Sequence, residues 1–254
     1  MNEEEITEQN DESNDYVQDT KTMSFLEHLD ELRRRLFYCI ISIFVAFIIC
    51  WIYSKQIFMI VVAPAIRYLT HGQQLSFFSI PEPFLLYMKV AFFAALFLDS
   101  PFILTQLWSF ISPGLYPKEK IYAIPFVVFT SFFFIAGGVF AYYVIFPLTC
   151  RFLLSYGEGF NAVLRITDYF SFFSKVILGV GLTFEMPMLA FFLGKLKIIT
   201  PKFLWRNFGY AVLIIFIIAA VVTPSTDAVT QTVLAVPMVA LYLISILVVW
   251  VTNK

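Results

Sequence analysis

The chain has 254 residues, of which 60% are hydrophobic and only 14% charged, and its mean hydropathy is +0.81. Soluble domains carry about a quarter charged residues, so this composition excludes a water-soluble globule and predicts a polytopic membrane protein. The formal net charge of −1 hides an asymmetry, because residues 1–20 contain eight acids and no Lys or Arg. We therefore expect residues 1–22 to form a disordered acidic tail and residues 23–254 to form one membrane domain.

An amphipathic helix is predicted where the tail ends. Ser24 and Glu27 have the spacing of a capping box, and apolar residues then recur at helical spacing as far as Leu36. Two acid–arginine pairs have i,i+4 spacing on its polar face, Asp30 with Arg34 and Glu31 with Arg35. Such a helix lies at a membrane face and leads into the first span. Its charges are either solvated anchors of the topology or part of a site.

Six apolar runs follow, and each is a candidate transmembrane helix. They cover residues 36–54, 90–112, 121–150, 169–194, 210–222 and 228–252. Asp99-Ser100-Pro101 interrupts the second run, and Gly137-Gly138 and Pro147 give the third run places to bend. The fifth run would make only about 20 Å of helix. We predict an all-α fold of six transmembrane helices, the last two short, with residues 56–88 as an extramembrane loop that contains short helical pieces.

The distribution of basic residues predicts the orientation of these spans. With six spans, the side that holds both termini collects eleven Lys and Arg, which are Lys21, Arg33, Arg34, Arg35, Lys118, Lys120, Lys195, Lys197, Lys202, Arg206 and Lys254. The other side holds five, which are Lys55, Arg67, Lys89, Arg151 and Arg165. The positive-inside rule then places both termini in the cytoplasm.

Polar residues within or beside the apolar runs are candidate functional groups. Glu185 lies inside the fourth run, where a charge is costly unless it faces protein or water. It is either a structural carboxyl or the polar floor of a cavity or substrate path. Asp227 is either the N-cap of the sixth helix, in competition with Thr226, or a partner of Gln231 one turn deeper. Asp99 is either a membrane-edge carboxylate or the cap of a helix break.

A second group of candidates lies at the predicted cytoplasmic face. Glu31 and Glu119 both emerge there, and Phe110 lies just inside it. Two carboxylates beside an aromatic ring make a receptor for guanidinium groups, through bidentate hydrogen bonds and cation–π contact. The sequence contains no Walker A, HExxH, G-x-S-x-G or Cys-x-x-Cys pattern. We therefore expect no enzyme activity, cofactor, metal site or nucleic-acid partner.

Five motifs, in order, resemble the TatC family, the multispanning receptor subunits of the twin-arginine protein translocase. They are His28-Leu29-Asp30-Glu31-Leu32-Arg33-Arg34-Arg35, Gln106 through Glu119, Ala141-Tyr142 with Phe146-Pro147-Leu148, Phe184-Glu185-Met186-Pro187, and Thr223-Pro224 through Met238. The likeness covers Ser24 to Trp250. One departure is Ser225-Thr226-Asp227-Ala228, where the family often has Pro-Asp-Pro; this chain is one residue longer there and lacks the last proline.

The resemblance implies a function that composition does not show. Proteins of this family bind signal peptides that carry consecutive arginines and help to export folded proteins across the bacterial inner membrane, driven by the protonmotive force. Expected partners are single-span subunits of the TatA/TatB type, other TatC copies and the lipid bilayer.

The resemblance also implies roles for individual residues. Glu31 and Glu119 would contact the arginine pair, and Arg33 and Phe110 would shape that site. Glu185 would line a concave face within the membrane. The remaining positions are Thr223 and Gln231, for the single-span partners, and Pro64 and Asp227, which match structural positions.

Alternative functions remain at this stage. A proton-coupled small-molecule transporter could use Glu185. Such a transporter would be expected to have inverted repeats and a second buried ionisable partner, and neither is visible in the sequence. A scaffold without a transport path leaves Glu185 and the paired acids unexplained. An intramembrane protease would need a paired Asp, Ser–His or HExxH arrangement, which this sequence lacks.

Overall fold

A computed structural model describes residues 25–66, 75–111, 123–157, 163–223 and 227–252, and its regular elements are helices. Five helical segments are long and apolar enough to cross a membrane: Glu27–Ile52, Glu82–Ile111, Pro125–Ser155, Ile166–Lys195 and Ala228–Thr252. The all-α polytopic fold is thereby confirmed, whereas the count of six spans is not. The predicted acidic tail and Ser24 lie outside the described residues.

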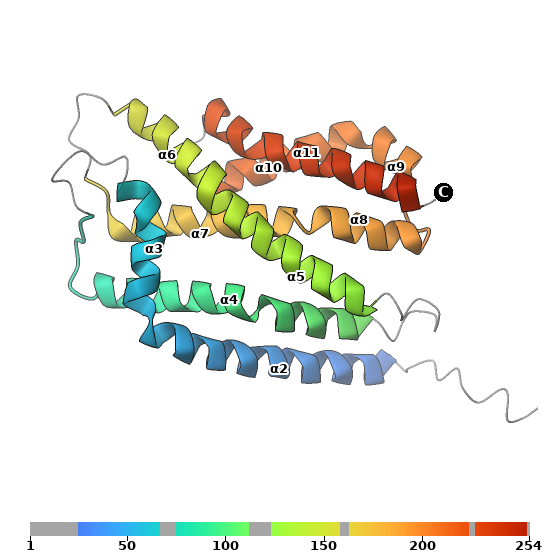
Figure 1. Cartoon of the computed structure of the whole chain (residues 1–254), viewed down its shortest axis with the longest axis horizontal. Coiled ribbons are helices and arrows are strands. Elements are labelled where there is room, and N and C mark those ends of the chain that lie inside the picture. The colour runs from blue at the N-terminus through green and yellow to red at the C-terminus, as the bar shows by residue number, and fades with distance from the viewer. Residues whose placement is uncertain (1–24, 67–74, 112–122, 158–162, 224–226, 253–254) are drawn as a thin grey trace, which may run out of the picture.

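Figure 1 shows the helical elements along the chain. They are α2 (Phe25–Ile52), α3 (Ser54–Ile66), α4 (Glu82–Ile111), α5 (Ala123–Phe140), the π-helix η3 (Ala141–Ile145), α6 (Phe146–Ser155), α7 (Ile166–Thr183), α8 (Met186–Lys195), α9 (Pro201–Arg206), α10 (Phe208–Val222) and α11 (Ala228–Thr252). Figure 1 shows the start of α2 and the end of α11 at the same end of the bundle. The fifth predicted span, α10, is short at 15 residues, but α11 has 25, so the prediction that both were short is wrong for α11.

Helix α4 runs without a break through Pro101, where the sequence predicted an interruption. Proline removes the amide that would bond to the Phe97 carbonyl, and the Ser100 hydroxyl donates to that carbonyl instead, at 2.8 Å. Such compensation lets proline stay inside membrane helices. Asp99 therefore does not cap a helix break, because α4 has no break there. It is buried, and it accepts a hydrogen bond from the Ser42 hydroxyl of α2.

Helix α3 overlaps residues 56–88, which were predicted as a loop with short helical pieces, and Pro64 is buried near its end. Because proline has no amide hydrogen, the Ile60 carbonyl one turn earlier lacks its helical partner. The Tyr142 hydroxyl of η3 donates to that carbonyl at 2.8 Å, and the Tyr169 hydroxyl of α7 donates to the neighbouring Val61 carbonyl at 2.7 Å. These two bonds join α3 to the rest of the bundle.

The third predicted span bends differently from the expectation. Helix α5 stays regular through Gly137-Gly138, and the irregular turn is the π-helix η3, just before Pro147. The glycines serve close packing instead. A Cβ on Gly137 would lie 2.7 Å from Phe184 Cγ and 3.0 Å from Gly181 Cα. Small residues of this kind let membrane helices approach closely, and here they bring α5 against α7.

Glu82 holds together the end of the bundle at which α4 and α7 begin (Figure 1). Its buried carboxylate accepts hydrogen bonds from Arg165 Nε at 2.8 Å and from the Thr167 hydroxyl at 2.7 Å. It also accepts from the backbone amides of Phe78 and Ser79. The hydrogen bond to Glu82 raises the pKa of Arg165, so the guanidinium stays charged and the clamp persists across physiological pH.

Candidate functional site

The first turns of α2 are tied to the last turns of α4 by the Arg35 guanidinium, which also pairs with the Glu31 carboxylate on its own helix. Glu31 is buried, at 7% exposure, and its Oε1 accepts from Arg35 Nε at 2.9 Å. Arg35 also donates to Gln106 Oε1 of α4 at 3.2 Å. The predicted i,i+4 pairing of Glu31 with Arg35 is confirmed. Within the described residues no ion pair joins Asp30 to Arg34.

A ring stack reinforces the same junction. The His28 ring of α2 lies 4.2 Å from the Phe110 ring of α4, with 15° between the planes. Glu31 keeps an unused acceptor beside this stack on α2, because its Oε2 is buried and has no hydrogen-bond partner in the described part of the chain. A buried carboxylate oxygen without a partner is costly, and a cationic donor would relieve that cost.

Of the other predicted signal-peptide residues, Arg33 contacts a ring of its own helix. The Arg33 side chain is exposed, and its guanidinium lies 5.8 Å above the Phe37 ring of the same helix. Glu119 lies outside the described residues. The structure thus brings Glu31, Arg35 and Phe110 to one helix junction. There it adds His28 and Gln106, whose contacts the sequence did not predict.

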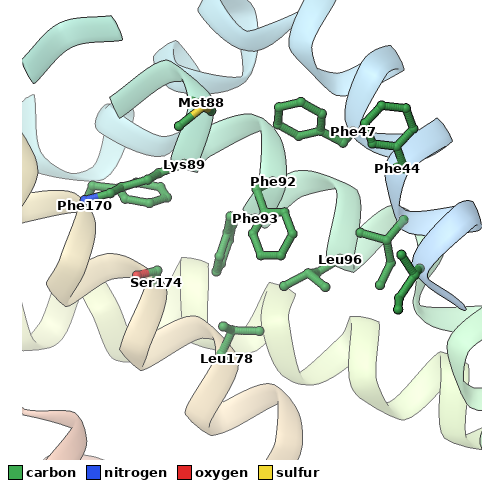
Figure 2. Close-up of a pocket in the computed structure, with 12 residues that line it drawn as sticks. Phe44, Phe47, Met88, Lys89, Phe92, Phe93, Leu96, Phe170, Ser174 and Leu178 are labelled. Atoms are coloured by element: carbon green, nitrogen blue, oxygen red, sulfur yellow. The ribbon is translucent and has the colours of Figure 1, made fainter. Parts of the chain in front are cut away.

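An apolar groove opens further along α2 and α4, with α7 as its third wall (Figure 2). Its volume is about 750 Å³. Figure 2 shows aromatic rings from all three helices around it, among them Phe47, Phe92 and Phe170. Lys89 and Ser174 are the polar side chains in its lining.

Glu185 lies at a break between two helices. Helix α7 ends at Thr183 and α8 begins at Met186, with Pro187 in its first turn. The Glu185 side chain is buried, and its Oε1 has no hydrogen-bond partner among the described residues. A buried carboxyl that the surrounding protein leaves unsatisfied is a candidate for a functional role.

The α10–α11 turn holds the last group of predicted residues. Asp227 caps α11, since its side chain accepts from the amides of Val229 and Thr230 at 3.1 and 2.8 Å. The N-cap interpretation of Asp227 is therefore confirmed, whereas Thr226 lies outside the described residues. Thr223 is buried and bonds to the Ala219 carbonyl of its own helix. Gln231 is half-buried one turn into α11.

Comparison with known proteins decides the family. The sequence profile of the Sec-independent protein translocase protein (TatC) matches residues 27–237. This chain belongs to the TatC family. It is similar to the TatC proteins of Koribacter versatilis, with 44% identity over 89% of this chain and 84% of the relative, and of Campylobacter jejuni, with 42% identity over 89% and 93%. A crystal structure of the twin arginine translocase receptor TatC superposes with a TM-score of 0.81, at 34% identity, over 90% of this chain and 100% of that one.

As a member of the TatC family, the chain is a component of a Sec-independent protein translocase. The alternative function, a small-molecule transporter that uses Glu185, is not supported by these comparisons. His28, Arg35 and Gln106 all lie inside the motifs that carry the TatC resemblance. The motifs were therefore the available signal for these three residues. In the described part of the chain no cluster of His, Cys, Asp and Glu is placed to hold a metal ion.

Proposed function

We propose that this TatC protein binds twin-arginine signal peptides at the α2–α4 junction. The observation that carries the proposal is the buried Glu31 carboxylate, which has one oxygen paired with Arg35 and the other without a partner among the described residues. A guanidinium of the peptide would donate to that second oxygen. Phe110, which stacks on His28 at the same junction, would offer its ring to the guanidinium. Glu119, on the segment that follows α4, would supply a second carboxylate.

The apolar groove supports a continuous binding path. Both α2 and α4 carry the junction at one end and line the groove further along. An apolar peptide segment that follows an arginine pair would bury its side chains against the groove's aromatic rings. Glu185 would provide a polar position deeper in the membrane, on the α7–α8 break.

Peptide binding tests this function. Purified protein in lipid nanodiscs should bind a synthetic signal peptide that carries two arginines, and a peptide with both arginines changed to lysine should bind at least about tenfold more weakly. Arginine forms a planar bidentate pair with carboxylate that lysine does not reproduce. Fluorescence anisotropy of labelled peptides measures the difference, and equal affinities would contradict the proposal.

The membrane orientation follows from the same assignment. The start of α2 and the end of α11 lie at one end of the bundle (Figure 1), and the topology predicted from the sequence gives the side with both termini eleven Lys and Arg against five. We place this end in the cytoplasm and the protein in the bacterial inner membrane, where it would receive precursors before export.

We further propose that Thr223 and Gln231 face single-span subunits of the TatA/TatB type, and that further copies of this chain join the complex. The Thr223 hydroxyl is bonded within α10, so it would contribute as an acceptor. The Gln231 amide has both a donor and an acceptor, and within a bilayer such groups bond across helices.

Changing Gln231→Leu should weaken association with the single-span partners by roughly 5- to 30-fold, the equivalent of one interhelical hydrogen bond of about 1–2 kcal/mol. Co-purification of tagged partners measures the loss. Thr232→Ala is the matched control, because Thr232 is exposed next to Gln231 and bonds to the Ala228 carbonyl of its own helix. Complexes of unchanged composition in the Gln231→Leu variant would refute the assignment of this face.

A further inference from the structure

A second groove lies between α9 and the last turns of α11, away from the α2–α4 junction. Its volume is about 690 Å³. One wall is apolar and consists of Leu243, Ile246, Leu247 and Trp250, which lie on one stripe of α11. The other wall is α9, which contributes Pro201, Lys202, Trp205 and Arg206.

Contacts behind the groove fix its shape. The Tyr242 hydroxyl of α11 donates to the Leu204 carbonyl at 2.9 Å, and Thr200 caps the start of α9 by accepting from the Phe203 amide. Lys202 and Arg206 both line the groove, and because they are four residues apart they lie on the same side of α9. Both are exposed, and neither has an ion pair in the described ranges.

Two tryptophans mark the depth of this groove in the membrane. Trp205 is 66% exposed and Trp250 53% exposed, one from each wall. Exposed tryptophans gather at the membrane–water interface. The groove therefore combines an apolar wall, two exposed tryptophan rings and two cations that have no ion pair among the described residues.

We propose that this groove binds an anionic phospholipid, with the phosphate between Lys202 and Arg206 and an acyl chain along the α11 stripe. Arginine pairs with phosphate through two parallel hydrogen bonds, and lysine adds a point charge. A zwitterionic lipid gains less, because its own cation opposes the two basic side chains. Bound lipid would brace α9, a helix of six residues, against α11.

Tryptophan quenching in nanodiscs tests the proposal with the full chain. The emission of Trp205 is obtained as the difference between the parent protein and a Trp205→Phe variant. Brominated phosphatidylglycerol, at a tenth of the lipid, should quench this emission more strongly than brominated phosphatidylcholine at the same fraction. Two basic residues should enrich the anionic lipid at the groove roughly 30-fold. The preference should disappear in Lys202→Gln/Arg206→Gln and persist in Arg34→Gln/Lys197→Gln, which removes the same charge from exposed positions outside the groove.

Three results would overturn the proposal. Equal quenching by the two lipids would show that the groove does not select charge. Loss of the preference on adding inorganic phosphate would assign the site to a free anion. Protection of Trp205 from both lipids would indicate that a protein surface, such as a second copy of the chain, covers the groove.

Discussion

Glu31→Gln should weaken binding of a twin-arginine signal peptide by roughly 30-fold or more, equivalent to about 2 kcal/mol. Glutamine keeps the size of the side chain but loses the charge, so a peptide guanidinium would lose a charge-assisted hydrogen bond. The change also leaves Arg35 without its carboxylate partner, and an unpaired cation at the junction repels an incoming arginine. Anisotropy titration of the labelled peptide measures the loss.

Two further variants separate contact from indirect effects. Asp30→Asn removes the same charge from an exposed position one residue away, and we expect peptide affinity within about twofold of the parent. Arg35→Gln removes the cation that occupies Glu31 Oε1 and should leave peptide binding intact or improve it. If Arg35→Gln weakens binding as much as Glu31→Gln does, Glu31 acts only by positioning Arg35, and direct contact is wrong.

Gly137→Leu should lower the free energy of unfolding by about 1–3 kcal/mol, the usual cost of overpacking a close-packed interior. A Cβ at this position would lie 2.8 Å from Phe184 Cβ and 3.0 Å from Gly181 Cα. Gly181 has no side chain to move aside, so the helix backbones of α5 and α7 must separate. Phe184 directly precedes Glu185 in the chain, so a displacement of Phe184 would also move the α7–α8 break.

Gly209→Leu provides the matched comparison. No atom lies within 4 Å of a Cβ built on Gly209, and leucine is a better helix former than glycine. Denaturation of the two variants in the same detergent should show a loss for Gly137→Leu and no loss for Gly209→Leu. Equal stability of both variants would mean that α5 and α7 do not meet at this glycine pair.

Hydrophobicity predicted the positions of the membrane helices, because a span of apolar residues is needed wherever a helix crosses lipid. It did not predict how the helices pass their prolines. Pro101 and Pro64 cannot donate the backbone hydrogen bond to the carbonyl four residues earlier, and the hydroxyls of Ser100 and Tyr142 donate to those carbonyls instead. The Tyr142 bond joins residues 82 positions apart in the chain, and such a contact depends on the tertiary fold.

Spacing along one helix predicted part of the site. The Glu31–Arg35 pair follows from i,i+4 geometry alone and is present. Local patterns do not say which residues on α4 meet this part of α2. The contacts of Gln106 with Arg35 and of Phe110 with His28 therefore appear only when the two helices pack. The same limit applies to Asp99, whose partner Ser42 lies on the preceding span.

The arginines of α2 divide by what they contact. Arg35 pairs with Glu31, whereas Arg33 stays exposed over Phe37. The basic residues of this helix therefore differ in role although they are adjacent in sequence. In the proposed mechanism Arg35 occupies one oxygen of Glu31, and the other oxygen of Glu31 receives the peptide.

Site-specific photocrosslinking tests the central claim most directly. A photoreactive residue replaces Leu107, an exposed position on α4 one turn before Phe110, and a second protein carries it at Phe78, exposed near the Glu82 clamp at the other end. A twin-arginine peptide added to nanodiscs should crosslink to position 107 and not to position 78, and the twin-lysine peptide should crosslink to neither. Crosslinks that are equal for the two peptides, or that form only at position 78, would contradict a signal-peptide site at the α2–α4 junction.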